Sequence, residues 1–339
     1  MKKIRVLITG ASGNVGYEAL KQMAAQTDRF DITVFDLENP KSEKLFSPYR
    51  DIIEIKYGDI TIKDDTSEIC KNKDYVIHLA ALIPPKADEL PELAKKINTD
   101  GTRNLVENLQ AFSPDAFLAY SSSVSVYGDR VKDPYIYVTD QLNPSPGDYY
   151  APTKIAAEEI IMNSGLNWTI FRLSAIMGAN NHKISSLMFH MPLDTPVEIT
   201  TPEDTARAFV NAADKKGQLN KRIFNLGGGE KNRIIYRDLL AENFKIFGLG
   251  KFDLPEKAFA EKNFHCGYYA DGDALEKIVR FRKDTIQTYL QKVKEAVPDI
   301  QRFATKLVAP IAKKMILKQS EPWEAFRNND KDKMNQYFH

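Results

Sequence analysis

Residues 8–20, "ITGASGNVGYEAL", join an apolar run to a segment of helical character through three spaced glycines. In this GxxGxxG pattern, glycine permits a tight turn, lets the backbone approach a diphosphate, and allows the helix to pack closely on the strand. The N-terminus of the helix adds N–H donors and partial positive charge. The stretch therefore predicts a strand, a turn and a helix that together bind a dinucleotide. The residues expected to contact it are Gly10, Ser12, Gly13, Asn14, Val15 and Gly16.

Apolar runs rich in Val and Ile alternate with helical patterns through the first half of the chain. The predicted strands span residues 4–9, 32–36, 52–57, 75–79, 116–121 and 168–173, and the predicted helices span residues 15–26, 66–70, 90–112 and 150–164. Such alternation is typical of βαβ units. It predicts an α/β fold of the Rossmann type, a doubly wound parallel sheet with helices on both faces.

The second predicted strand ends at Asp36, 20 residues beyond Gly16. An acid at this distance accepts hydrogen bonds from the adenine ribose and repels a 2′-phosphate, which favours NAD over NADP. Ligands of such sheets bind at the carboxyl ends of the strands. Further cofactor contacts are expected there from Asp59, Ile60, Leu79, Ala80, Ala81, Asn98 and Ser121. The nearby His78 is interpreted as a packed, structural side chain.

Five motifs, "TGASGNVG", "GDI", "HLAA", "YSSSVSVYG" and "YAPTK", follow one another in this order. With these motifs the chain resembles the short-chain dehydrogenase/reductase superfamily, and in particular its extended branch, the NAD-dependent epimerase/dehydratase family. The resemblance covers about residues 1–240. It implies NAD as cofactor and a catalytic set made of a serine or threonine, a tyrosine and a lysine.

The catalytic set can be carried over by position. Only Tyr150, and not Tyr149, lies four residues before Lys154 in a YxxxK motif. Residues four apart share a helix face, so the lysine ammonium is expected to lower the pKa of the tyrosine. Tyr150 and Lys154 are also expected to contact the nicotinamide end of the cofactor. Ser123 lies five residues before the glycine of "YSSSVSVYG", with Ser122 as the alternative.

The chemistry that the resemblance implies is hydride transfer between an alcohol or carbonyl carbon and the nicotinamide, with the tyrosine moving the proton. Dehydratases of this branch carry Asp-Glu where this chain has Val124-Ser125, which speaks against dehydration. Nucleotide-sugar epimerases carry an asparagine where this chain has Ala175. The lead hypothesis is therefore an NAD-dependent alcohol dehydrogenase or carbonyl reductase, and the alternatives are a nucleotide-sugar epimerase and a non-catalytic NAD sensor.

The segments expected to line the substrate pocket are rich in apolar side chains, which favours a rather apolar small molecule, although the same side chains could belong to the core. The substrate contacts expected are Ile83, Pro84, Ser123, Ala175, Met177 and Met188. The chain has 47 basic and 46 acidic residues, so no nucleic-acid partner is expected. Its two cysteines and scattered histidines indicate neither disulfides nor a metal site. No run is apolar enough to span a membrane or act as a signal peptide, and a cytoplasmic location is expected.

The predicted NAD-binding domain covers residues 1–178, with residues 197–228 returning to it. Within the returning segment, Thr201 is predicted to cap a helix that begins at Pro202. Residues 179–196 and 229–339 are assigned to a smaller, mostly helical substrate lobe and a C-terminal extension.

The extension places Phe303, Leu307 and Ile311 at successive i+4 positions among several lysines, with Pro310 expected to kink or divide the helix. A helical cap packed on the lobe or on the second subunit of a homodimer is the favoured interpretation. Peripheral contact with a membrane is the alternative.

Overall fold

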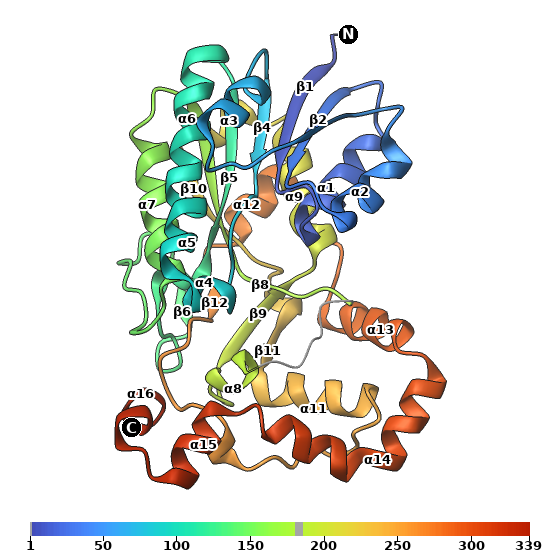
Figure 1. Ribbon diagram of the computed structural model, residues 1–339, viewed down its shortest axis with the longest axis vertical. Coiled ribbons are helices and arrows are strands. Elements are labelled where there is room, and N and C mark those ends of the chain that lie inside the picture. The colour runs from blue at the N-terminus through green and yellow to red at the C-terminus, as the bar shows by residue number, and fades with distance from the viewer. Residues whose placement is uncertain (1, 180–185) are drawn as a thin grey trace.

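The computed structural model describes residues 2–179 and 186–339 (Figure 1). Its centre is a seven-stranded sheet with the order β10-β7-β5-β4-β1-β2-β3, in which every pair of neighbouring strands is parallel. The strands are β1 (Ile4–Thr9), β2 (Phe30–Asp36), β3 (Glu54–Tyr57), β4 (Tyr75–His78), β5 (Phe117–Ser123), β7 (Asn167–Leu173) and β10 (Arg222–Leu226). The predicted parallel sheet is confirmed.

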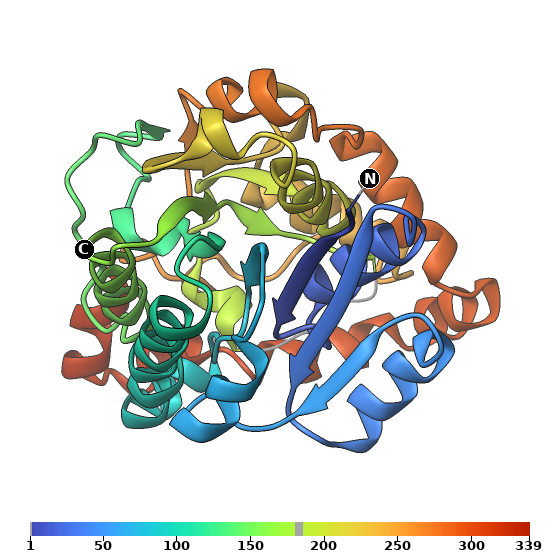
Figure 2. The same cartoon turned by 90° about the horizontal axis from the view of Figure 1, so that it is seen from above.

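Helices cover both faces of this sheet, as Figure 2 shows from above. One face packs on α1 (Asn14–Ala24), α9 (Pro202–Ala212) and α12 (Asp273–Val279). The other face packs on α3 (Lys63–Ile69), α6 (Gly101–Phe112) and α7 (Tyr150–Met162). The central strands β1, β4 and β5 are buried on both sides, which explains why they read as continuous apolar runs in the sequence.

The segment predicted as one helix over residues 90–112 differs in the structure. It consists of α5 (Pro91–Lys95), a π-helical turn (Lys96–Asp100) and α6, preceded by α4 (Lys86–Glu89). A π-helical turn holds more residues than an α-helical one, and such turns often occur at functional sites. Apolar periodicity alone could not reveal it. Helix α2 (Pro40–Phe46) was not predicted, although Asn39 and Pro40 form an N-terminal capping signal.

A second, smaller group of elements lies below the sheet in Figure 1. It surrounds its own apolar core, which includes Phe189, Val197, Phe259 and Tyr289. Its strands are β8 (Ala175–Ile176), β9 (Pro196–Thr200) and β11 (Arg233–Ile235), and its helices are α8 (Leu187–His190), α11 (Tyr236–Ile246), α13 (Ile286–Ala296), α14 (Asp299–Leu317), α15 (Glu321–Asn328) and α16 (Lys331–Tyr337). Outside both groups lie the paired strands β6 (Tyr135–Ile136) and β12 (Tyr268–Tyr269), whereas the short helix α10 (Lys216–Leu219) buries Leu219 in the core of the large sheet. Pro310 lies inside α14 without dividing it, contrary to one of the two expectations.

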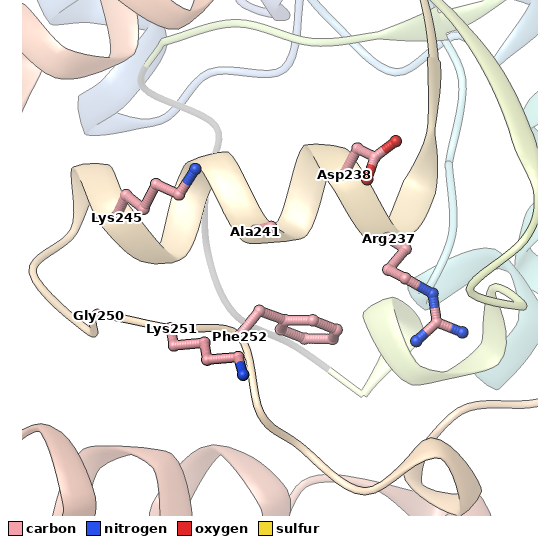
Figure 3. A pocket seen from close by; sticks show the side chains of 7 residues that line it. All are labelled: Arg237, Asp238, Ala241, Lys245, Gly250, Lys251 and Phe252. Atoms are coloured by element: carbon pink, nitrogen blue, oxygen red, sulfur yellow. The ribbon is translucent and has the colours of Figure 1, made fainter.

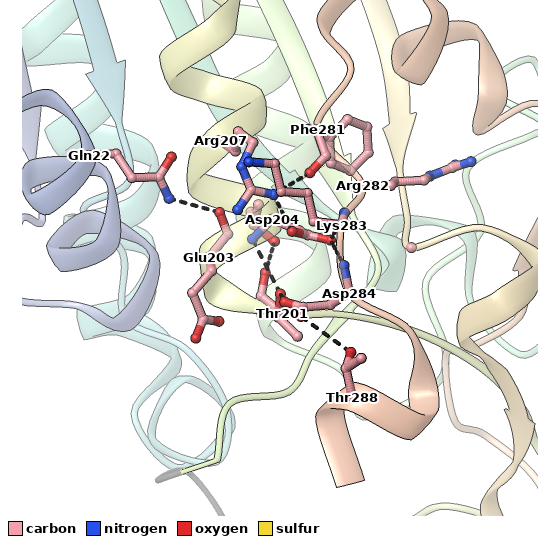
Figure 4. Close-up of polar contacts among 12 residues, drawn as sticks. Gln22, Thr201, Glu203, Asp204, Arg207, Phe281, Arg282, Lys283, Asp284 and Thr288 are labelled. Atoms are coloured by element: carbon pink, nitrogen blue, oxygen red, sulfur yellow. Dashed lines mark hydrogen bonds and ion pairs between the residues drawn. The ribbon is translucent and has the colours of Figure 1, made fainter. Parts of the chain in front are cut away.

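Helix α9 connects the two groups through a buried carboxylate (Figure 4). Thr201 caps this helix through the N–H of Asp204, as predicted. The Asp204 carboxylate accepts hydrogen bonds from the N–H groups of Lys283 and Asp284 at 2.8 and 2.9 Å and pairs with Arg207. Arg207 in turn donates to the carbonyl of Phe281. The segment before α13 is thereby fixed to a helix that packs on the large sheet.

Among the residues that the structure describes, no helix has both the length and the apolarity needed to cross a bilayer.

Candidate active site

The turn between β1 and α1 requires glycine at two positions, Gly10 because of its positive φ and both Gly10 and Gly16 because the backbone approaches them closely. Gly10 has a φ of +71°, and a Cβ there would lie 2.6 Å from the backbone nitrogen of Ala80. A Cβ at Gly16 would lie 2.3 Å from the carbonyl oxygen of Gly10. Both positions therefore require glycine. At Gly13, the N-cap of α1, an added Cβ would meet only the Gly10 carbonyl oxygen, at 3.2 Å.

Asp36 lies beside this turn, at the end of β2. Its carboxylate accepts hydrogen bonds from the N–H of Ser12 at 2.7 Å and from the N–H of Leu37 at 2.9 Å. The following N–H groups of Asn14 and Val15 open α1 and have no carbonyl within the helix to bond. Backbone donors at a helix start, next to a carboxylate that ribose hydroxyls could reach, fit the diphosphate and ribose of NAD.

The other predicted cofactor residues occupy the same edge of the sheet. Leu79, Ala80 and Ala81 follow β4, and Ser121 lies near the end of β5, where its hydroxyl donates to the His78 carbonyl at 3.2 Å. Asp59, after β3, accepts the N–H of Thr61 at 2.8 Å. Ile60 is buried in the core beneath α6. The topology thus brings together strand ends that are far apart in the sequence.

His78 is fully buried between two hydroxyl groups. Its Nδ1 lies 2.7 Å from Oγ1 of Thr9 and its Nε2 lies 2.9 Å from Oγ1 of Thr102. Burial, together with the nearby Lys154, lowers the pKa of His78 to about 3, so the ring is neutral. These contacts agree with the interpretation of His78 as a packed, structural side chain.

Helix α7 begins at Tyr150 and separates the two tyrosines of "DYYAPTK". Tyr149 is 54% exposed, whereas Tyr150 is only 8% exposed and directed into the protein. One turn later, the Nζ of Lys154 donates to the carbonyl of Ser121 at 2.9 Å. It lies 5.6 Å from the ring centroid of Tyr150 and 4.8 Å from that of Tyr120. Burial lowers the pKa of Lys154 to about 7, although Glu158 acts against the shift.

The expectation for the pKa of Tyr150 is wrong for this structure. Burial raises the pKa of the phenol above its ordinary value, and the negative charge of Asp148 adds to the increase. The hydrogen bond with the Ser123 side chain lowers it, but by less. Helix spacing does bring Lys154 near the ring, but desolvation of the phenolate outweighs other influences on its pKa. The protonated phenol is therefore the favoured form.

Ser123 and Ser122 have different surroundings. Ser123 ends β5, and its hydroxyl oxygen accepts from the N–H and hydroxyl of Ser125, at 3.1 and 2.9 Å, in a short 3₁₀ helix (Val124–Tyr127). The hydroxyl of Ser122 is buried and has no hydrogen-bond partner among the described residues. Of the two, it is the Ser123 side chain that affects the pKa of Tyr150, which favours Ser123 over Ser122 as the neighbour of the phenol.

Asn98 lies in the π-helical turn and ties the loop after β4 to α7. Its Oδ1 accepts the N–H of Leu82 at 2.7 Å, and its Nδ2 donates to the Leu82 carbonyl at 2.9 Å and to Oγ1 of Thr153 at 3.0 Å. Thr153 stands beside Lys154 in sequence, so Asn98 helps to hold α7 in place. Sequence reasoning singled out neither Thr153 nor Tyr120, because no local pattern distinguishes them.

The predicted substrate residues lie in two places. Ile83 is exposed and Pro84 half-buried, on the loop that Asn98 holds. Ala175, Met177 and Met188 are half-buried against the second core. The cavities described for the structure lie elsewhere: one of about 460 Å³ lies beside α11 and is lined by Arg237, Asp238, Ala241, Lys245, Gly250, Lys251 and Phe252 (Figure 3).

The parallel sheet, the glycine turn and the tyrosine–lysine pair define a Rossmann-type protein of the short-chain dehydrogenase/reductase class. The sequence of residues 6–227 matches the model of the family described as "NAD dependent epimerase/dehydratase family". The chain belongs to this family. The family is NAD-dependent, and the residues around the glycine turn fit that cofactor.

Curated relatives have several activities. A sterol-4-alpha-carboxylate 3-dehydrogenase (decarboxylating) of Candida albicans is 31% identical over 193 residues, which are 53% of this chain and 52% of the relative. A D-erythronate dehydrogenase of Haemophilus influenzae is 24% identical over 163 residues, 47% of this chain and 49% of the relative. The chain thus spans about half the length of these relatives.

Solved structures share the fold. A short-chain dehydrogenase/reductase superfamily protein of Agrobacterium tumefaciens with bound NAD has a TM-score of 0.69 at 19% identity, covering 89% of this chain and 99% of that one. The dTDP-glucose 4,6-dehydratase DesIV of Streptomyces venezuelae, with NAD bound, has a TM-score of 0.72 at 18% identity, covering 86% and 96%.

Proposed function

We propose that this protein is an NAD-dependent dehydrogenase that interconverts a secondary alcohol and a ketone, or an aldehyde and its alcohol, on a rather apolar small molecule. The observation that carries the proposal is the convergence of Ser123 and Lys154 on the buried Tyr150, at the sheet edge where the glycine turn and Asp36 also lie. Ser123 comes from the end of β5, and Tyr150 and Lys154 come from the first turns of α7.

NAD, when bound, accepts a hydride from the alcohol carbon or, as NADH, returns it to the carbonyl carbon. In reduction the protonated Tyr150 gives its proton to the carbonyl oxygen, and in oxidation the deprotonated Tyr150 takes the hydroxyl proton of the alcohol. Because burial raises its pKa, the resting phenol holds the proton that reduction requires. Ser123 orients the substrate oxygen beside Tyr150. Lys154, whose Nζ donates to the Ser121 carbonyl and lies 5.6 Å from the centroid of the Tyr150 ring, places positive charge beside the phenol when it is protonated.

The preference for an apolar substrate rests on side chains that follow β7 and pack against the second core. Ala175 stands where nucleotide-sugar epimerases of this family carry an asparagine. Alanine has no side-chain amide that could donate a hydrogen bond to a diphosphate. Met177 and Met188 add further apolar surface against the second core. The name of the Candida relative, a sterol-carboxylate dehydrogenase, supports the same class of substrate.

The test follows NADH absorbance when the purified protein is mixed with NAD and a panel of sterols, smaller secondary alcohols, aldonates and nucleotide sugars. Tyr150→Phe should abolish turnover and leave NAD affinity nearly unchanged, since only the phenolic oxygen is lost. Tyr149→Phe is the matched control and should keep most activity, because this neighbour is largely exposed.

Other outcomes would overturn the proposal. Conversion of a nucleotide sugar without net change of cofactor would identify an epimerase. Tight NAD binding without turnover of any substrate would favour the NAD sensor. Greater loss of activity in Tyr149→Phe than in Tyr150→Phe would refute the assignment of the catalytic tyrosine.

A further inference from the structure

Helix α14 presents an apolar face outward. Ile300 is 84% exposed. Four more large apolar side chains follow it along α14 at steps of three or four residues, and each is 63–70% exposed. Residues so spaced lie on one side of a helix. We call this set the apolar face; it consists of Ile300, Phe303, Leu307, Ile311 and Met315. Val308, which is 48% exposed, lies at its border.

The opposite side of α14 attaches the helix to the protein. Ile316 is buried in the second core, and Ala312 and Leu317 pack against that core. The Nζ of Lys313 donates to the Lys251 carbonyl at 2.7 Å and pairs with Asp253 at 2.6 Å. The predicted cap on the lobe thus accounts for the inner side of the helix but leaves the apolar face in solvent. Figure 1 shows α14 at the outer border of the lobe.

The charge around the apolar face is mainly positive, and the one acid of α14, Asp299 at its first position, is paired with Arg302. Residues 300–320 contain no Asp or Glu and five basic side chains, which are Arg302, Lys306, Lys313, Lys314 and Lys318. Lys306, Lys314 and Lys318 form no ion pair with any other described residue. An exposed apolar helix face bordered by free cations is typical of helices that lie in the interface of an anionic bilayer.

Two neighbouring cavities extend this basic surface from α14 toward α11. The one in Figure 3 has Arg237, Lys245 and Lys251 among its lining residues, with Asp238 as its acid. The second, of about 470 Å³, shares Lys245 and Gly250 with the first and is completed by Gly248, Asp299, Arg302, Phe303 and Lys306. Lys245 is also paired with Glu242. Phe303 belongs both to the second cavity and to the apolar face, so apolar and basic surfaces meet there.

We propose that α14 docks this protein on the surface of an anionic lipid bilayer. The apolar face enters the boundary between headgroups and acyl chains, and the lysines around it and in the adjoining cavities contact the anionic headgroups. A second copy of the chain is disfavoured as the occupant, because joining two such faces would bring two sets of unpaired lysines together. The proposal concerns a surface separate from the catalytic residues and does not depend on the proposed reaction.

The experiment measures co-sedimentation of the full chain with vesicles. One set contains phosphatidylcholine alone, and the other contains phosphatidylcholine with phosphatidylglycerol as the anionic lipid. The protein should bind the anionic vesicles and should be released by added salt, which screens the lysines. The variant Phe303→Ser/Leu307→Ser/Ile311→Ser should bind at least about tenfold more weakly, because three side chains that enter the lipid boundary are removed.

The control replaces three large apolar side chains that are also exposed but lie on other parts of the chain. Ile52, Ile62 and Phe112 are 48%, 49% and 43% exposed, so their triple replacement by Ser should leave vesicle binding unchanged. Thermal unfolding and NAD binding verify that each variant is folded.

Three results would overturn the proposal. These are absence of binding to anionic vesicles, equal binding by the α14 variant and the unchanged chain, or a dimer in solution that the α14 variant dissociates. The last result would show that the apolar face joins two copies of the chain.

Discussion

Keeping the buried Lys154 protonated lowers the stability of the folded protein, and the size of this effect can be measured as a change in the free energy of unfolding. We consider its replacement by Met, which has similar length and no charge. Lys154 is 2% exposed, and burial lowers its pKa from the ordinary 10.5 to about 7. The two values differ by about 3.5, which corresponds to a cost of roughly 5 kcal/mol for keeping the side chain protonated in the folded state.

The sign of the pH dependence follows from these pKa values. Between about pH 7 and 10.5, the unfolded chain keeps the lysine proton that the folded chain has lost, so stability rises with pH in this window. Below about pH 7 the lysine is protonated in both the folded and the unfolded chain, and the folded protein is destabilised by the full cost of the buried charge. The Met variant has no such group. The unfolding free energy of the unchanged protein minus that of Lys154→Met should therefore increase with pH, with a slope approaching about 1.4 kcal/mol per pH unit.

The assay is urea unfolding at a series of pH values, followed by tryptophan fluorescence, to which the buried Trp168 and the partly buried Trp323 both contribute. Lys132→Met, at an exposed position, is the control and should differ from the unchanged protein by an amount independent of pH. A constant difference for Lys154→Met between about pH 6 and pH 9 would refute the reasoning. It would mean that the Ser121 carbonyl and the neighbouring rings hold the lysine charged at its ordinary pKa.

Two further predictions concern the buried ion pair and the cofactor. Arg172 bonds Glu158 through two nitrogens at 3.0 and 2.7 Å, with both side chains buried; Glu158→Gln should lower the free energy of unfolding by about 3–5 kcal/mol, because a buried arginine loses its counter-charge. Urea unfolding measures this loss, and a change below about 1 kcal/mol would contradict it. Asp36→Ala should weaken NADH binding and raise the affinity for NADPH relative to it, because the acid that would repel a 2′-phosphate is gone. Calorimetric titration with both cofactors gives the ratio, and an unchanged ratio would exclude Asp36 from the ribose site.

The parts of the site that the sequence predicted well depend on local spacing. The glycine turn, the strand that ends at Asp36 and the shared helix face of Tyr150 and Lys154 all follow from distances of a few residues along the chain. The steric need for glycine at positions 10 and 16 agrees with that pattern. Periodicity also indicated the strands, because those at the centre of a parallel sheet are apolar throughout.

Other properties depend on neighbours from distant segments. The π-helical turn brings Asn98 to Leu82 and Thr153, a contact that helix periodicity does not contain. The phenol of Tyr150 has a raised pKa because surrounding elements remove water from it, against the local effect of spacing.

The sequence by itself determined the parallel α/β fold, the glycine turn after β1 and which tyrosine shares a helix face with Lys154, because these rest on backbone sterics and helical spacing. Only the tertiary structure decided how deeply Tyr150 and Lys154 are buried and which side of α14 meets solvent. Residues 300–316 show an amphipathic pattern in sequence, but the pattern cannot say whether its apolar side faces inward. That choice depends on Ile316 and Lys313, which attach the opposite side of the helix to the second core and to Asp253.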